Sequence, residues 1–417
     1  MRKLLSNRGL NWSLFDQGLV SGVNFLSTIV VAILLGADDF GLFATLWLLL
    51  LFINSTHTAL IVFPMMTLVP KQEDKCRYFG SLLIQQIAFL LLSLVLTCCV
   101  LLLYLEYVDV DLNLESILSF LLLLTLYHMH DFYRRYFFSI SNYGNAFVID
   151  LLAYFTRLLV LVAAYIFKYE LGISDVFLIF SIAYFIGIIF GARRYDFMFD
   201  SSHIVKDLKQ HWELSKWLLP SGLMQWTSVN LYIVGAAIIL GPVSVGVIRV
   251  GQNIVAIFNV VIQGVENHIP VEASGVYKKS GISSLYKYLV KVVLIGVAFV
   301  FIVEIFAMLF SDEIILYLYG EKYIEASNVV VWYSFILIFV FVMVPIRVFL
   351  RTISRTKIWF NSYVMASLFS LVMFYPLVKE YGVDGVMMGM LFTYIILLVS
   401  VVVMIFKEKD EYDCCKK

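Results

Sequence analysis

The stretch "AILLGADDFGLFA", from Ala32 to Ala44, closes one apolar run, turns, and opens the next. The stretch "AIILGPVSVGVIR", from Ala237 to Arg249, repeats its alanine, its isoleucine, a leucine and both glycines at a constant offset of 205 residues. Glycine tolerates a positive φ angle, which by itself explains one convenient hairpin corner. Because the same offset also brings the neighbouring apolar runs into register, the two corners predict an internal duplication.

The composition places the chain in a membrane. Hydrophobic residues make up 62% of it and charged residues 14%, and the mean hydropathy is +0.92, which is far too apolar for a soluble protein. The five cysteines occur as one single residue and two adjacent pairs, without the spacing of a zinc site. The sequence therefore predicts no metal and no cofactor, and it indicates no binding of nucleic acid.

Twelve apolar runs are long enough to cross a hydrocarbon core of about 30 Å as helices. They lack the alternation of barrel strands, and a span in lipid must satisfy its own backbone polar groups. We therefore expect an all-α integral membrane protein with about 12 transmembrane helices. The runs lie at roughly 14–35, 42–68, 79–104, 116–138, 146–167, 172–191, 216–240, 247–270, 286–310, 328–350, 358–378 and 385–406.

The positions of lysine and arginine predict the orientation. Of the 30 basic residues, 25 lie in the two termini and in the loops of one side, and the other side holds only Lys168, Lys322 and Lys379. The positive-inside rule makes the basic side cytoplasmic, together with both termini. We place the segment "FYRRYF" (132–137) in one of these cytoplasmic loops.

Six spans precede the longest cytoplasmic segment and six follow it, so both halves have the same orientation. This predicts two six-helix lobes related by a pseudo-two-fold axis along the membrane normal. The expected division is an N-lobe at 1–195, a cytoplasmic linker at 196–215, a C-lobe at 216–406 and a cytoplasmic tail at 407–417. A weaker repeat supports it, since Gly172 before span 6 corresponds to Gly382 before span 12.

The pattern "DQGLVSGVNFLSTIVVAILLGADDFGLFA", Asp16 to Ala44, resembles the first hairpin of the polysaccharide transporters. These form the O-antigen flippase group of the multidrug, oligosaccharidyl-lipid and polysaccharide exporter superfamily. The resemblance extends to "GVENHIPVEAS", where span 8 ends at Pro270 before a basic loop. It implies two lobes around a central cavity that opens alternately to each side, and no enzymatic activity.

The resemblance also implies a cargo and a location. The cargo is an oligosaccharide on an isoprenoid pyrophosphate, moved from the cytoplasmic to the outer leaflet for surface polysaccharide such as the O-antigen of lipopolysaccharide. The membrane is the bacterial cytoplasmic (inner) membrane. The partners expected besides membrane lipids are a polysaccharide polymerase or glycosyltransferase, and H⁺ or Na⁺ as a coupling ion.

Arg157 is a charged residue near the middle of span 5, and Asp150 lies seven residues earlier on the same helix face. A charge in hydrocarbon costs at least about 2.5 kcal/mol, so it requires a cavity or a partner. One interpretation is that the guanidinium contacts the pyrophosphate of the cargo with its forked donors. The other is that Arg157 and Asp150 form a buried ion pair that holds the lobe together.

Further polar residues are candidates for lining the cavity. Span 8 is the most polar helix, and spans 1 and 7, the first helices of the two halves, also contain polar residues. Amides that join neighbouring helices are the alternative explanation, at about 0.6 kcal/mol per contact. With Arg157, the candidates are Arg249, Gln252, Asn253, Asn259, Gln263, Asn24 and Gln225.

The candidates for ion coupling are the carboxylates Asp16, Asp150 and Glu266. Asp16 has an alternative role as a solvated residue at the cytoplasmic mouth of span 1. Without a P-loop, transport must draw on an ion gradient, the membrane potential or the cargo gradient.

Other function classes remain as alternatives. An ion-coupled multidrug exporter of the same superfamily is the nearest, although its cavity should favour cations through buried acids. A membrane glycosyltransferase or polymerase is a weaker alternative. Asp38 and Asp39 could hold a metal, but only about six residues separate spans 1 and 2.

Overall fold

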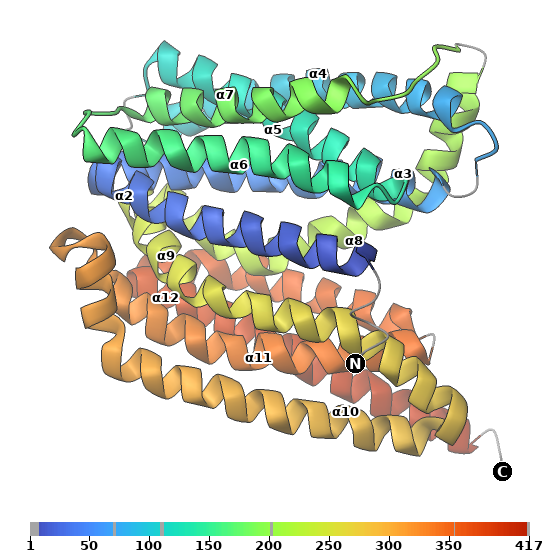
Figure 1. Ribbon diagram of the computed structural model, residues 1–417. Coiled ribbons are helices and arrows are strands. Elements are labelled where there is room, and N and C mark those ends of the chain that lie inside the picture. The colour runs from blue at the N-terminus through green and yellow to red at the C-terminus, as the bar shows by residue number, and fades with distance from the viewer. Residues whose placement is uncertain (1–7, 70–71, 109–111, 201–202, 354, 415–417) are drawn as a thin grey trace. The chain divides into compact units, whose positions relative to one another are not determined.

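The computed structural model describes residues 8–69, 72–108, 112–200, 203–353 and 355–414. The described side chains exclude those at 8–11, 13–14, 259–268, 271, 356, 406 and 408–414. The described backbone is helical, without strands, and Figure 1 labels most of its elements. In chain order these are α2 (Arg8–His57), the π-helical turn η1 (Thr58–Val62), α3 (Phe63–Leu68), α4 (Lys75–Tyr107), α5 (Leu114–Ser139), α6 (Tyr143–Ile166), α7 (Ile173–Ala192), α8 (Ile204–Ile239), α9 (Pro242–Val255), the 3-10 turn η4 (Ala256–Phe258), α10 (Asn259–Tyr319), the 3-10 turn η5 (Glu321–Tyr323), α11 (Ala326–Thr352) and α12 (Thr356–Cys414).

Glycines divide the longest helices. Gly36 in α2, Gly281 in α10 and Gly382 in α12 have φ angles of 74°, 73° and 57°, so each of these helices is two helical segments joined at a corner. With this division, helical segments cover all of the predicted spans, which confirms the all-helical membrane fold. The predicted span at 247–270 is divided among α9, η4 and the start of α10. Eight described helices are long and apolar enough to cross a membrane, and the chain is a multi-pass membrane protein.

The two corners of the duplicated motif have the same backbone conformation. Gly36 has φ 74° and ψ −178°, and Gly241, 205 residues later, has φ 89° and ψ 171°. This region of the φ/ψ map is open essentially to glycine alone. The weaker repeat does not share its conformation, since Gly172 has φ −86° and Gly382 has φ 57°.

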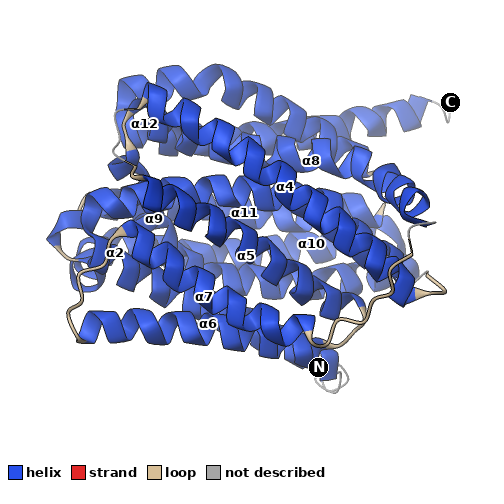
Figure 2. Cartoon of the chain, turned by 90° about the horizontal axis from the view of Figure 1, so that it is seen from above, coloured by secondary structure: helices blue, strands red, loops and turns tan. Residues whose placement is uncertain are grey.

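The chain forms two compact units, Met1–Leu223 and Met224–Lys417. In the first unit α5, α6 and α7 pack together, and α2 packs along α6 (Figures 1 and 2). Their core is aromatic. Phe177 of α7 lies 5.8 Å from Phe43 of α2 and 5.4 Å from Phe120 of α5, measured between ring centroids.

The segment between α7 and α8 is bound to the first unit. Tyr195 donates a hydrogen bond from its hydroxyl to the carbonyl of Phe79 at 2.6 Å, and the amide of Met198 donates to the carbonyl of Cys76 at 2.9 Å. Burial raises the pKa of the Tyr195 phenol, which keeps it a neutral donor. The start of α8 follows the same unit, because Ser215 donates to the carbonyl of Ala59 at 3.1 Å.

In the second unit, small polar residues join the later part of α8 to both halves of α12. Ser367 and Ser370 donate to the carbonyls of Met224 and Ser228, at 2.7 Å and 2.9 Å. Thr393 lies 3.2 Å from the Tyr232 hydroxyl. Such small residues allow close approach of helices in lipid, where apolar side chains alone give little preference for one partner.

Candidate functional site

Arg134 of α5 lies at the centre of a buried ionic network in the first unit. Its Nη2 atom is 2.6 Å from Oδ2 of Asp16 on α2, and its Nε atom donates to Oδ2 of Asp150 on α6. Asp16 and Asp150 are 1% and 0% exposed. One arginine thus ties three helices together through two carboxylates that water does not reach.

Asp131 extends this network by one turn of α5. Its Oδ1 atom is 3.2 Å from Arg135 and 4.0 Å from Arg134, and its Oδ2 atom is 3.9 Å from His57 on α2. His130, from the same turn, lies 3.5 Å from Oδ1 of Asp150. Because this end of α5 is polar, α5 is less apolar than the other long helices of the first unit. It is the one described long helix of that unit that is not apolar enough to count as a candidate span.

Three oxygens of the network have no hydrogen-bond partner among the described residues. They are Oδ1 of Asp16, Oδ1 of Asp150 and Oδ2 of Asp131, and all three are buried. A buried oxygen without a donor is unfavourable by roughly 1–3 kcal/mol. These atoms are therefore the places in the network where a proton or a cation would gain most.

Arg157 of α6 is separate from this network. Its Nη2 atom donates to Oδ1 of Asn24 on α2 at 2.7 Å, and its Nη1 atom donates to the Tyr184 hydroxyl at 3.3 Å. The guanidinium also lies 4.7 Å and 4.6 Å from the ring centroids of Tyr154 and Phe180. No carboxylate of the described residues lies within 4.0 Å of it, so this buried cation is held by amide, hydroxyl and aromatic groups.

These contacts correct three expectations from the sequence. The ion pair between Arg157 and Asp150 is wrong, because the partner of Asp150 is Arg134. Asp16 is buried and paired, so it is not solvated at a mouth. The segment that includes Arg134 and Arg135 is helical and belongs to α5, which agrees with the predicted span at 116–138 and not with the loop in which we also placed it.

The structure does not bring the remaining predicted cavity residues together as it does Arg157 and Asn24. In the second unit Asn253 donates to the Tyr319 hydroxyl at 2.7 Å, and Arg249 and Gln252 on the same helix are half-buried. Gln225 is exposed. The side chains of three further candidates lie outside the described residues: Asn259, Gln263 and Glu266.

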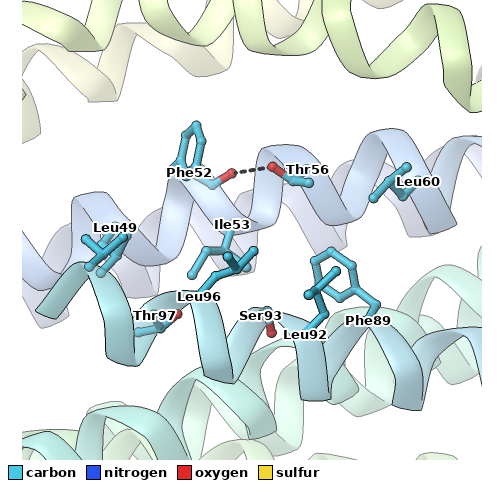
Figure 3. A pocket seen from close by; sticks show the side chains of 11 residues that line it. Leu49, Phe52, Ile53, Thr56, Leu60, Phe89, Leu92, Ser93, Leu96 and Thr97 are labelled. Carbon is cyan, nitrogen blue, oxygen red and sulfur yellow. Dashed lines mark hydrogen bonds between the residues drawn. The ribbon is translucent and has the colours of Figure 1, made fainter. Parts of the chain in front are cut away.

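A narrow apolar crevice lies beside the network. It measures about 110 Å³ and lies between the second half of α2 and α4, and Ile53, Leu96 and Phe89 are among the residues that line it (Figure 3). Phe89 also packs on His57, with 5.1 Å between ring centroids. One residue that lines the crevice therefore contacts the histidine that links α2 to Asp131.

With the helices and their buried charges in place, the fold can be compared with solved structures. A multidrug resistance transporter of the MATE family, in an inward-facing conformation, aligns with a TM-score of 0.71 at 13% identity and covers 94% of both chains. The lipid II flippase MurJ, in an inward closed conformation, aligns with a TM-score of 0.67 at 16% identity and covers 95% of this chain and 87% of its own. The chain has the fold of the MOP superfamily.

A third solved structure with this fold is that of a MOP superfamily transporter from Pyrococcus furiosus. Its reported binding pocket has reverse polarity, which suggests a different function for that protein. It aligns with a TM-score of 0.61 at 12% identity over 97% of this chain and 94% of its own. The sequence matches no protein-family model, and no curated protein matches it. The likeness confirms the all-helical, two-lobed fold that the sequence predicted.

Proposed function

We propose that this protein is a flippase for a lipid-linked oligosaccharide. It takes up an oligosaccharide on an isoprenoid pyrophosphate at the cytoplasmic leaflet and releases it at the outer leaflet by alternating access. Surface polysaccharide such as O-antigen would be the end product. The fold supports a transporter, and the charge of the buried polar groups supports an anionic cargo.

The single observation that carries the proposal is Arg157. It is 1% exposed, lies within a membrane-spanning helix, and has no described carboxylate within 4.0 Å. An uncompensated cation at such a depth is unfavourable and is found where a protein handles a charged substrate. A guanidinium offers forked donors that match phosphate oxygens.

Asn24 connects this cation to the surface of α2. Its Oδ1 atom accepts from Arg157, which orients the amide so that its nitrogen, with two hydrogens, is directed away from the guanidinium. Asn24 is half-buried, whereas Arg157 is buried. A phosphate that approached Asn24 would meet an oriented donor first and the cation behind it.

The ionic network supplies a place for a coupling ion. Among the described residues, Asp16, Asp131 and Asp150 have two arginines, Arg134 and Arg135, and two histidines, His57 and His130, within 4.0 Å. With the histidines neutral and the other five groups ionised, the network has one excess negative charge, and three of its carboxylate oxygens have no hydrogen-bond donor among the described residues. A proton or Na⁺ would neutralise that excess, so Asp16 and Asp150 remain our candidates for coupling.

The same excess of acid favours the second candidate function, an ion-coupled multidrug exporter. Two of the three fold relatives described above differ in cargo by name, a multidrug transporter and a lipid II flippase. An organic cation would bind at the unpaired carboxylate oxygens and be repelled by Arg157. The two functions therefore make opposite demands on the charge of the cargo.

The experiment that tests the proposal measures in which leaflet lipid-linked sugar accumulates. A strain that lacks the protein, and any substitute flippase, should retain its lipid-linked oligosaccharide on the cytoplasmic side, and the intact gene should restore outer-leaflet levels. Normal outer-leaflet levels in that strain would reject the flippase. Loss of resistance to cationic drugs with normal lipid-linked sugar would support the exporter instead.

A further inference from the structure

The second unit contains a larger apolar pocket that the proposed transport does not use. It has a volume of about 610 Å³ and lies between the start of the second segment of α10, the end of α11 and the end of α12. Its lining includes Tyr286 and Val293 of α10, Phe349 of α11 and Ile405 of α12. This volume is in the range of small-molecule sites, about 300–1,000 Å³.

Packed regions of α10, α11 and α12 flank the pocket. On one side Leu289 packs with Val348 and Phe349, and on the other Phe349 packs with Ile358 and Val401. Pro345, inside α11, lines the pocket between these two packed regions. A proline within a helix removes one backbone hydrogen bond, and its ring leaves no long side chain at that position to fill the space.

The length of the pocket matches one leaflet. Its lining residues on α10 run from Ile282 to Val293, which is about 17 Å along a helix at 1.5 Å per residue. One leaflet accounts for half of a hydrocarbon core that is about 30 Å thick, and this half-thickness is similar to the length of the pocket. Tyr286 is 63% exposed at the open side, so a chain that enters from the bilayer can lie along α10.

Basic residues surround the segments that line the pocket. Among the described side chains of 272–293, 345–359 and 402–407 there are nine lysines and arginines and one acid, Glu272. Lys287 and Lys291 are exposed, and each follows a lining residue by one position. Lysine keeps its charge in the headgroup region while its stem lies on apolar surface. The segments that line the crevice of Figure 3 differ in this respect, since 49–60 and 89–100 contain no lysine or arginine.

We propose that this pocket binds an anionic phospholipid of the leaflet that contacts the basic ends of the helices. The acyl chain fills the apolar space between α10, α11 and α12, and the phosphate lies among the lysines that follow Tyr286 and Val290. Basic pockets between transmembrane helices on the cytoplasmic side are a recognised way to bind acidic headgroups. The inference does not depend on the cargo of the transporter.

The test uses the purified full-length chain and phosphatidylglycerol as the probe, with phosphatidylcholine for comparison. Lipid retained in native mass spectra and the shift in unfolding temperature both report binding, because a ligand of the folded state stabilises it. We expect phosphatidylglycerol to be retained and to raise the unfolding temperature, and phosphatidylcholine to do neither.

Two variants separate the charge from the apolar space. The double variant Lys287→Gln, Lys291→Gln should bind phosphatidylglycerol roughly 30-fold more weakly, from ~1 kcal/mol per basic residue. Val293→Trp should fill the pocket and abolish retention. The matched controls are the double variant Lys322→Gln, Lys379→Gln, two exposed lysines of the same unit, and Ile302→Trp, which is exposed and does not line the pocket.

Three results would overturn the proposal. In the first, the pocket variants behave like their controls. In the second, phosphatidylcholine binds as well as phosphatidylglycerol, so that charge is not recognised. In the third, a polyisoprenyl phosphate displaces phosphatidylglycerol at equal concentration, and the pocket then belongs to the cargo. Each variant is first checked for helical content and a single size-exclusion peak, so that loss of binding is not loss of folding.

Discussion

Arg157 on α6 donates a hydrogen bond to Asn24 on α2 across 2.7 Å and 133 residues of sequence. Both residues are polar groups in the middle of apolar helices, and each gives the other a partner. The bond leaves the positive charge of Arg157 without a described counter-ion, because an amide oxygen carries only a partial charge. The pair therefore has the properties of an anion site more than those of a structural ion pair.

We predict that Arg157→Gln is inserted normally and does not export polysaccharide. A hydrogen bond to a charged group contributes roughly 1.5–3 kcal/mol, so loss of the charge should weaken phosphate binding by about 10- to 100-fold. Arg157→Lys retains the charge without the fork and should keep part of the activity. Membrane abundance and surface polysaccharide are the two measurements, with Lys168→Gln as an exposed control.

Adding Asp150→Asn to Arg157→Gln tests whether the arginine has a structural role. On our interpretation the second change restores nothing, because Asp150 is paired with Arg134. Recovery of export in the double variant would contradict us. Arg249 in the second unit would then become the residue to test, since no described carboxylate lies within 4.0 Å of it either.

We predict a different result for Arg134, which is structural. Arg134→Gln leaves Asp16 and Asp150 buried without their cation, and breaking a buried pair in this way costs about 3–5 kcal/mol of stability. Arg135→Gln should cost less, because that side chain is 34% exposed. Thermal unfolding in detergent measures the stability of both variants. We expect the unfolding temperature of Arg134→Gln to be well below that of Arg135→Gln.

A second substitution makes the Arg134 prediction specific. Replacing Asp150 by Asn together with Arg134→Gln removes one of the two stranded charges, so part of the lost stability should return. Equal stability of the single and double variants would mean that the network is not held by charge. In that case the excess carboxylate would no longer be an argument for ion coupling.

The sequence predicted the helices and their division well, because apolar length and glycine corners are local features. Runs of apolar residues report the hydrocarbon thickness directly, and Gly36 and Gly241 report a backbone conformation that other residues avoid. The network was not predicted. Arg134 lies within the polar sequence "YHMHDFYRR" (127–135), which reads as a helix end meeting a cytoplasmic loop.

A signal for Arg134 was present in the helical period. Asp131 and Arg134 are three residues apart, and Asp131 and Arg135 are four apart, which places them on one face of a helix. The charge of that face required partners on other helices. Which helix would supply them depends on tertiary packing between residues more than 100 positions apart, as in the pair of Asp16 and Arg134, and one sequence does not contain that information.

We predict that position 206 is cytoplasmic and position 170 is outside. The reason is the excess of lysine and arginine on one side, and both residues are exposed. In a variant whose native cysteines are replaced by serine, Lys206→Cys should react with a membrane-impermeant thiol reagent only after the cells are opened. Glu170→Cys should react in intact cells, and the reverse pattern would invert the topology.

The last prediction concerns the two corners. Gly36 and Gly241 have positive φ and extended ψ, and a Cβ atom added to either would meet nothing within 4 Å. Substitution by alanine therefore introduces no clash and changes only the backbone energy, by about 1–3 kcal/mol in this region. We expect Gly36→Ala and Gly241→Ala to lower the free energy of unfolding in mixed micelles by similar amounts.

Gly22 and Gly275 are the controls for these two glycines. They also have nothing within 4 Å, but they lie in helices without a positive φ, so alanine should stabilise by about 0.5–1 kcal/mol. If alanine lowers the free energy of unfolding at the two corners and raises it at the two controls, the conformation of the corner requires glycine in both halves. The space around the corner would not be the reason. Equal and small effects at all four positions would mean that the corners relax. The recurrence at an offset of 205 residues would then reflect ancestry alone, without a shared requirement of the backbone.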